Sequence, residues 1–478
     1  MNNELMKEID LYKNLPRVER RKQERMLQKK YNDKTIRIKN GKKFQKSEGL
    51  TRKTRRILSK NTNLLKEILK IIHKYFPTLT NSFSKLTDIR HQSYTKYKMR
   101  TIIMIRLFAL ICGITTMTGI NSKFDTEKAI KNFPKICGQD LKEIPDWQTI
   151  QDVIETLNYD EIDSIRREMF KALIRSKMFD KYRYNGYIQI LVDATGLSTH
   201  DYNLNGNCIT KTFKDGKTKY YKYILEAKAV FGNVVISIDS EWIENTKLNN
   251  ESEKQDCEVN AFKRMATRLK KNFPKLKFII TGDVLYATTP MINICKDNKW
   301  KYIFNLKKDR LKTVYEIFTD NINYLNETNK ENYYLSKNIE FNDNIFDVFK
   351  YVETKNKKTT IFHYVSNLNV KNSNIKQIVN MGRKRWKIEN EGFNIQKNGT
   401  FNISHLCSRF DNALKIHYLF IQMAHTIRQL LEYGSLIIKS LKITKKEEIS
   451  FKLIGSLISS NQTNLESLDL NFQLRFDT

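Results

Sequence analysis

Short apolar runs alternate with helical segments between residues 187 and 305, and this alternation limits the folds open to the chain. YIQILVDATG, LKFIITGD and WKYIFNLK have the length and composition of buried strands. Two further strand-like runs meet at Gly232-Asn233, which predicts a β-hairpin. The segments CEVNAFKRMATRLKKNF and TPMINICKDNK are helical in pattern. The predicted order is strand, strand, strand, helix, strand, helix, strand, which is typical of a mixed α/β sheet.

Regions of different composition flank this sheet. Residues 308–378 are rich in Asn, Lys and Tyr and contain strand-like runs, which predicts a β-rich insertion before the helical segment RWKIENEGFNIQ. Residues 1–60 hold 20 Lys and Arg against 7 Asp and Glu, which favours a flexible basic arm. We therefore divide the chain into four parts: an arm (1–60), a helical N-terminal domain (61–180), an α/β domain with its insertion (181–435) and a C-terminal tail (436–478).

The charge of the chain indicates a polyanionic partner. The sequence has 85 Lys and Arg against 52 Asp and Glu, a formal net charge of +33, which favours nucleic acid. The abundance of Lys, Asn and Ile also fits an AT-rich genome, which would account for part of this excess. Six isolated cysteines without a CxxC pair, and a start without an apolar signal segment, predict a cytoplasmic protein. Arg106 interrupts the most apolar stretch, so we expect a buried helix there.

Three acidic residues stand where ligand sites form in α/β sheets. Asp193 and Asp283 end the first and fourth predicted strands, and a third acid, Glu389 or Glu391, comes from the helix after the insertion. Carboxylate oxygens suit Mg²⁺ or Mn²⁺. A competing interpretation is that each Asp caps a turn.

Helix geometry separates the two candidates for the third acid. At about 100° per residue, Glu389 and Glu391 would point to nearly opposite sides of a regular helix. Arg385, Glu389 and Gln396 would then share one face, which suits a surface that grips phosphate and holds metal. The alternative is an ordinary salt bridge between Arg385 and Glu389.

The segments VDATGL, KQDCEVNAFKRMATRLKKNFPKLKFIITGDVLYA, WKYIFNLK and RWKIENEGFN resemble bacterial insertion-sequence DDE transposases, most nearly the insertion-sequence-four-like branch. The resemblance spans about residues 85–435. It implies an RNase H-like α/β fold with a β insertion before the last catalytic helix. It also implies that Asp193, Asp283 and Glu389 are the catalytic, metal-binding acids, with Glu391 as the second choice for the third.

The chain departs from the family's Tyr-x2-Arg-x3-Glu-x6-Lys signature at both ends. Arg385 and Glu389 match the signature, but Gly382 stands where Tyr is expected and Gln396 where Lys is expected. A lysine, Lys397, follows one position later. The resemblance implies DNA contacts from the signature region, for which the candidates are Arg383, Arg385, Trp386 and Lys397.

The implied activity is that of a polynucleotidyl transferase with DNA endonuclease activity. Two Mg²⁺ or Mn²⁺ ions would assist hydrolysis at an element end, and the released 3′-hydroxyl would then attack target DNA. The expected partners are double-stranded DNA at terminal inverted repeats, target DNA and a second copy of the chain on DNA, within the nucleoid. The alternatives are a captured transposase that only binds DNA and an RNase H-like host nuclease.

Overall fold

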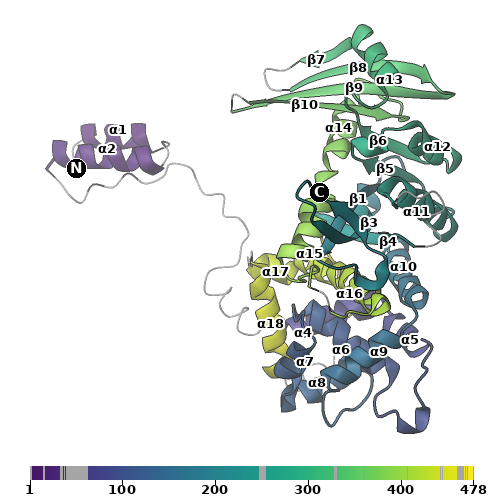
Figure 1. Ribbon diagram of the computed structural model, residues 1–478. Helices are drawn as coiled ribbons and strands as arrows, with labels where there is room; N and C mark the ends of the chain where they lie inside the picture. The colour runs from purple at the N-terminus through teal and green to yellow at the C-terminus, as the bar shows by residue number, and fades with distance from the viewer. Residues whose placement is uncertain are drawn as a thin grey trace. The chain divides into compact units, whose positions relative to one another are not determined.

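The computed structural model divides the chain into two units, residues 1–61 and 62–478. The described residues are 3–32 except 14 and 16, then 36, 38, 63–459 except 247–254, 328–330, 357, 406, 442 and 444, and finally 468, 470 and 472–476. Most of the second half of the predicted basic arm, including TRKTRRILSK, lies outside these residues. Figure 1 shows the elements of the second unit, which holds the sheet.

The first unit contains two helices, α1 (Asn3–Tyr12) and α2 (Arg17–Lys30). The sequence of α2, RVERRKQERMLQKK, is mostly charged, so few of its side chains favour burial. A small apolar cluster of Leu5, Leu27, Ile36 and Ile38 holds the two helices together. Because this cluster is small, the unit gains little stability from burial.

One mixed sheet forms the centre of the second unit (Figure 1). β1 (Ile188–His200) pairs in parallel with β5 (Phe278–Gly282) and antiparallel with β3 (Thr218–Phe231). β5 pairs in parallel with β6 (Lys301–Asn305), while β2 (Ile209–Thr212) and β4 (Val234–Ile243) pair with successive parts of β3. All of β5 and the first five residues of β1 are buried, which explains their continuous apolar runs.

The predicted element order is confirmed, with one added strand, β2, and a longer first strand. The hairpin at Gly232-Asn233 joins β3 to β4, and the two predicted helices are α11 (Glu258–Asn272) and α12 (Thr289–Asp297). β2 was not predicted, because ITKT is short and half exposed. β1 does not end at Gly196 as expected but continues to His200, with a shift of register between Gly196 and Ser198.

The insertion extends the same sheet rather than forming a separate one. β10 pairs antiparallel with β6, and the sheet then continues through β9, β8 and β7. Figure 1 shows these strands beyond β6, with α13 against them. The bounds are α13 (Lys312–Asp320), β7 (Asn323–Glu327), β8 (Glu331–Phe341), β9 (Asn344–Lys355) and β10 (Lys358–Ser366).

Helices pack around and below the sheet. The N-terminal helices of this unit are α4 (Leu64–Tyr75), α5 (Leu79–Ser84), α6 (Met99–Ile111), α7 (Thr118–Phe124), α8 (Glu127–Cys137), α9 (Trp147–Thr156) and α10 (Tyr159–Arg175). Almost all of α6 is buried, including Arg106, as expected for this apolar stretch. Across the described residues, no helix is both long and apolar enough to cross a membrane.

A long C-terminal helix, α16 (Asp411–Gln429), connects the two regions of this unit. It packs against α6, α9, α10 and β4, so one apolar core runs from the helical region into the sheet. The segment that we expected to be a tail contributes α17 (Leu436–Leu441) and α18 (Lys446–Ser459). α18 packs against α4 and α8 and buries Leu453 and Leu457 in the core.

Candidate active site

Two of the predicted acids lie at the same edge of the sheet. β1 and β5 pair in parallel as far as Leu191 and Thr281, and Asp193 and Asp283 each follow two residues later. Parallel neighbouring strands direct their carboxyl ends to one side, so the two side chains share an electrostatic environment. Consistent with this, the charge of Asp283 raises the pKa of Asp193.

Asp283 also caps a turn, as the competing interpretation predicted. Its Oδ1 accepts a hydrogen bond of 2.8 Å from the backbone N–H of Leu285, at the start of the 3₁₀ turn η4 (Val284–Tyr286). This bond fixes the direction of the carboxylate at the strand end. Capping and ligand binding are compatible, since a carboxylate has two oxygens that accept bonds.

The third acid comes from an irregular helical segment. α14 (Ile375–Arg383) is followed by a turn, by the π-helix η5 (Ile388–Phe393) and by α15 (Asn394–Asn398). Within η5 the charge of Glu389 raises the pKa of Asp193. Glu391 instead accepts a hydrogen bond of 3.2 Å from the hydroxyl of Tyr433. The structure therefore brings Glu389 into the electrostatic environment of Asp193, while Glu391 bonds to Tyr433.

The carboxyl group of Asp193 has a raised pKa. Burial, and then the charges of Asp283 and Glu389, raise its pKa to about 6, while the guanidinium of Arg385 opposes the shift. Arg385 Nη1 lies 3.3 Å from Asp193 Oδ2. The buried Nε of Arg385 bonds to no described residue, so this arginine retains an unused donor near the acids.

The π-helix corrects our prediction that Arg385, Glu389 and Gln396 share a face. That prediction assumed a regular α-helix, but Arg385 lies in the turn before η5, and a π-turn adds one residue to a helical repeat. Gln396 is fully buried and donates a hydrogen bond of 2.7 Å to Gln422. Lys397 is half-buried and donates a 2.6 Å hydrogen bond to the hydroxyl of Thr195, two residues beyond Asp193.

The added residue accounts for the displaced lysine of the signature. Seven residues make almost two turns of an α-helix, so a lysine seven positions after the glutamate returns to the same face. With one π-turn between them, the eighth position takes that place. Lys397 is eight residues after Glu389, and the charge of Glu389 raises the pKa of Lys397 against the effect of burial.

An aromatic ring from the insertion explains why the signature begins with glycine in this chain. A Cβ at Gly382 would lie 2.6 Å from Cε1 of Tyr364, a buried β10 residue. The ring of Tyr364 therefore fills the space beside position 382, where the family signature has a tyrosine.

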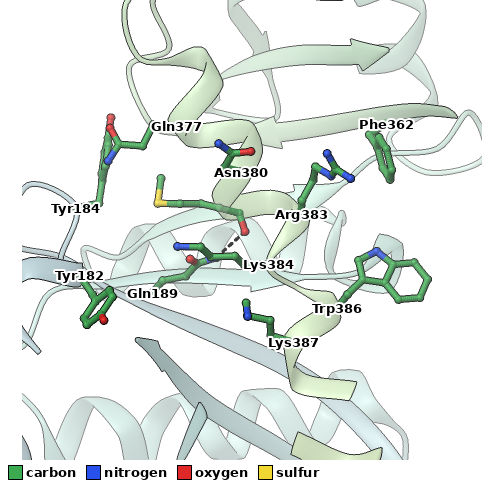
Figure 2. A pocket seen from close by; sticks show the side chains of 11 residues that line it. Tyr182, Tyr184, Gln189, Phe362, Gln377, Asn380, Arg383, Lys384, Trp386 and Lys387 are labelled. Atoms are coloured by element: carbon green, nitrogen blue, oxygen red, sulfur yellow. Dashed lines mark hydrogen bonds between the residues drawn. The ribbon is translucent and has the colours of Figure 1, made fainter. Parts of the chain in front are cut away.

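A basic, aromatic pocket of about 660 Å³ adjoins the signature segment (Figure 2). Figure 2 shows Lys384 pointing toward Gln189 and Arg383 toward Phe362, with Trp386 and Lys387 farther along the same segment. The Trp386 side chain is 52% exposed, so it is not packed under the helix. Arg383 is anchored, because it forms an ion pair of 3.0 Å with Glu353 and lies over the Phe362 ring.

Sequence reasoning missed a fourth acid in this environment. Glu258, the first residue of α11, accepts a 2.5 Å hydrogen bond from the hydroxyl of Tyr286. Burial, and then the charges of Asp193 and Asp283, raise its pKa to about 7, although the Tyr286 bond and Arg385 oppose the shift. The sequence signal that could have revealed Glu258 is its place at the start of the helix that precedes β5, the strand followed by Asp283.

The donor set has the chemistry that a hard divalent cation requires, since every acid supplies carboxylate oxygens. The positions of these acids, by contrast, do not form a complete set of metal ligands. Within the described part of the chain, no group of three or more His, Cys, Asp or Glu side chains is gathered closely enough to hold one ion. Arg385 supplies the positive charge beside Asp193 in this structure.

The sheet order β4-β3-β1-β5-β6 and the acids at its edge define an RNase H-like core of the kind found in polynucleotidyl transferases. A family model described as a transposase DDE domain matches residues 184–427, more than half of the 478-residue chain. A second model, for a region associated with that domain, matches residues 80–168. The chain belongs to the DDE transposases of insertion sequences.

Family membership establishes the class of activity. DDE transposases are DNA-cutting and DNA-joining enzymes that use divalent metal ions, so the chain is a transposase and polynucleotidyl transferase with DNA as substrate. A comparison with curated proteins found no match to the chain. The branch within the insertion-sequence transposases stays a prediction.

Proposed function

We propose that Asp193, Asp283 and Glu389 are the catalytic acids, and that they hold two Mg²⁺ or Mn²⁺ ions during cut-and-paste transposition. The observation that carries this proposal is that the charges of Asp283 and Glu389 both act on Asp193. Such ions, when bound, activate the attacking water or 3′-hydroxyl and stabilise the leaving oxygen.

Arg385 has two tasks in this account. Before metal binds, it neutralises Asp193 and limits the repulsion among the acids. When DNA enters, its guanidinium is placed to donate to a phosphate oxygen beside the cleaved bond. The contact with Asp193 thus holds the guanidinium ready at the place where the phosphodiester must lie.

Lys397 and the pocket of Figure 2 supply the nearby DNA contacts. Lys397 bonds to Thr195, which lies two residues after Asp193 on β1. Its side chain can therefore contact the same DNA end as Asp193. Trp386 offers an exposed ring for a base, and Lys384 and Lys387 line the pocket with positive charge. Arg383, already paired with Glu353, serves to hold Phe362 and the insertion in place.

The wider surface suits terminal inverted repeats of double-stranded DNA. The net charge of +33 and the basic helix α2 supply phosphate contacts, which give affinity without sequence choice. We propose that two copies of the chain act together on two DNA ends, and that the enzyme works in the nucleoid, where its substrate lies.

A transposition assay in cells tests this assignment. A marker gene between the element's own ends is supplied together with wild type, Asp193→Asn, Asp283→Asn, Glu389→Gln or Glu391→Gln. We expect transposition to fall below detection for the first three variants and to persist for Glu391→Gln. Persistent transposition in Asp193→Asn or Asp283→Asn would overturn the assignment. Specific DNA binding without transposition by wild type would instead favour the captured DNA-binding protein.

A further inference from the structure

A fully buried lysine lies beneath the helical segment that carries Glu389. Lys228 is a residue of β3, and its Nζ lies 3.4 Å from Oε2 of Glu226, which is also fully buried. A buried ion pair adds little net stability, because the loss of hydration offsets the attraction between the two charges. Stability alone therefore does not explain why a lysine stands at this position.

The side chain of Lys228 packs directly against the π-helix η5. A Cβ at Gly392 would lie 3.3 Å from both Cδ and Cε of Lys228, so the glycine leaves room for the lysine stem. The Nζ of Lys228 lies 5.5 Å from the centre of the Phe393 ring, at the end of η5. The lysine thus contacts the two last residues of the π-turn.

The ammonium group of Lys228 joins a buried pair of amides. Its Nζ donates a 2.8 Å hydrogen bond to Oε1 of Gln422, a buried residue of α16. The same oxygen accepts a 2.7 Å hydrogen bond from Nε2 of Gln396, and Gln422 Nε2 donates to Oε1 of Gln396 at 3.3 Å. Because a lysine can only donate, it holds the oxygen of Gln422 toward itself and so fixes the orientation of both amides.

The amide pair determines which residue of α15 faces inward. Apolar contacts are non-directional and would tolerate a shift of one residue along the segment. Without the extra residue of the π-turn, Ile395 would take the place of Gln396, and the Gln422 amide would lose its buried partner. The network therefore favours the register with Gln396 inward, which is the register in which Lys397 bonds to Thr195.

We propose that Lys228 is a positioning residue for DNA cleavage: through Gln422 and Gln396 it holds the π-turn in register and so keeps Glu389 and Lys397 on one side of the segment. This inference rests on the proposed role of Glu389 as a catalytic acid. The buried network selects one arrangement of the segment rather than adding to the stability of the fold.

The test compares DNA cutting with folding and DNA binding. Glu226→Gln/Lys228→Met removes both charges together and nearly keeps the size of the side chains, so we expect a Tm close to that of wild type. With Mg²⁺ and saturating DNA that carries the element ends, its single-turnover cutting rate should fall by about tenfold or more. The DNA concentration for half-maximal cutting should not change. A lysine that served only stability would lower Tm instead of the cutting rate.

Two further variants separate the register from general effects. Lys222→Met/Glu244→Gln removes another buried ion pair, of 3.6 Å, whose lysine also lies on β3, and it should cut at the wild-type rate. Gln396→Met breaks the network from the helix side and should slow cutting at unchanged DNA binding. Its loss should not add to that of Glu226→Gln/Lys228→Met, because both changes release the same register.

The outcomes distinguish this inference from the function on which it rests. Wild-type cutting by Glu226→Gln/Lys228→Met, an equal loss in Lys222→Met/Glu244→Gln, or additive losses with Gln396→Met would overturn the role of Lys228 alone. If the ion-pair variant does not fold, Gln396→Met decides, and wild-type cutting by it overturns the inference. Wild-type cutting by Glu389→Gln would overturn the proposed catalytic acid together with this inference.

Discussion

Gly382 offers a direct test of how the insertion is fitted to the signature helix. An alanine there places its Cβ 2.6 Å from Cε1 and 2.9 Å from Cζ of Tyr364. Both distances are below van der Waals contact, and Tyr364 is 1% exposed on a strand that pairs with β6 and β9 on its two sides. The ring therefore has little room to move, and the substitution must strain the packing between α14 and β10.

Two opposing effects determine how much Gly382→Ala changes the free energy of unfolding. Replacing glycine by alanine in a helix favours folding by about 1 kcal/mol. Overpacking a rigid core costs about 1–3 kcal/mol, and the short contacts and buried ring point to the upper part of that range. The net expectation for Gly382→Ala is a loss of about 1–2 kcal/mol in the free energy of unfolding. In a unit of this size, that corresponds to a fall of roughly 1–2 °C in Tm.

Thermal unfolding of four proteins separates the two effects. Wild type, Gly382→Ala, Tyr364→Leu and the double variant form a double-mutant cycle that isolates the contact. Tyr364→Leu lowers Tm on its own through lost burial, but in that background Gly382→Ala should no longer destabilise. A Gly382→Ala variant as stable as wild type, or equally destabilising in both backgrounds, would refute the packing argument.

Three further predictions concern pH, the displaced lysine and DNA. Burial lowers the pKa of His363 to about 4. The folded state therefore disfavours the charged ring, and stability that is complete above pH 6.5 falls as the pH drops toward 4. After allowance for the partial exposure of the ring, this loss in the free energy of unfolding is about 1–2 kcal/mol. In urea unfolding measured at several pH values, His363→Phe should remove this loss. A pH dependence unchanged by the substitution would contradict the assignment to His363. Lys397→Ala should impair DNA cleavage, and adding Gln396→Lys should not restore it, because position 396 is buried; restoration would show that the π-turn does not set the register. Trp386→Ala should weaken binding to the element ends by about 1–3 kcal/mol with little change in its salt dependence, whereas Lys387→Ala should lower the salt slope by about 1; binding titrations at several salt concentrations distinguish these results.

The sequence predicted the sheet well because its signals are local. Buried strands such as β5 are continuous apolar runs, and Gly232-Asn233 carries the turn chemistry of a hairpin. Asp146 has the residue type and position of a helix cap, and its side chain accepts a hydrogen bond of 2.8 Å from the backbone N–H of Gln148 at the start of α9. The two Asp residues were found because the ends of parallel strands follow from the element order.

The sequence failed where the geometry depends on tertiary packing. The π-turn of η5 has no local signature, and it coincides with Gly392, where an added Cβ would lie 3.3 Å from the buried side chain of Lys228. Glu258 was missed because its partner, Tyr286, is distant in sequence. The segment 436–478 looked like a tail because the surfaces that bury Leu453 and Leu457 lie on helices several hundred residues earlier.

The central claim is that Asp193, Asp283 and Glu389 act together as the acids of a DDE transposase. The most direct measurement is Mg²⁺- or Mn²⁺-dependent cutting of DNA that carries the ends of the element, by purified wild type and by Glu389→Gln and Glu391→Gln, each checked for DNA binding. The account predicts cutting at the element ends by wild type and Glu391→Gln, and none by Glu389→Gln. Cutting by Glu389→Gln, with loss of cutting in Glu391→Gln, would contradict it.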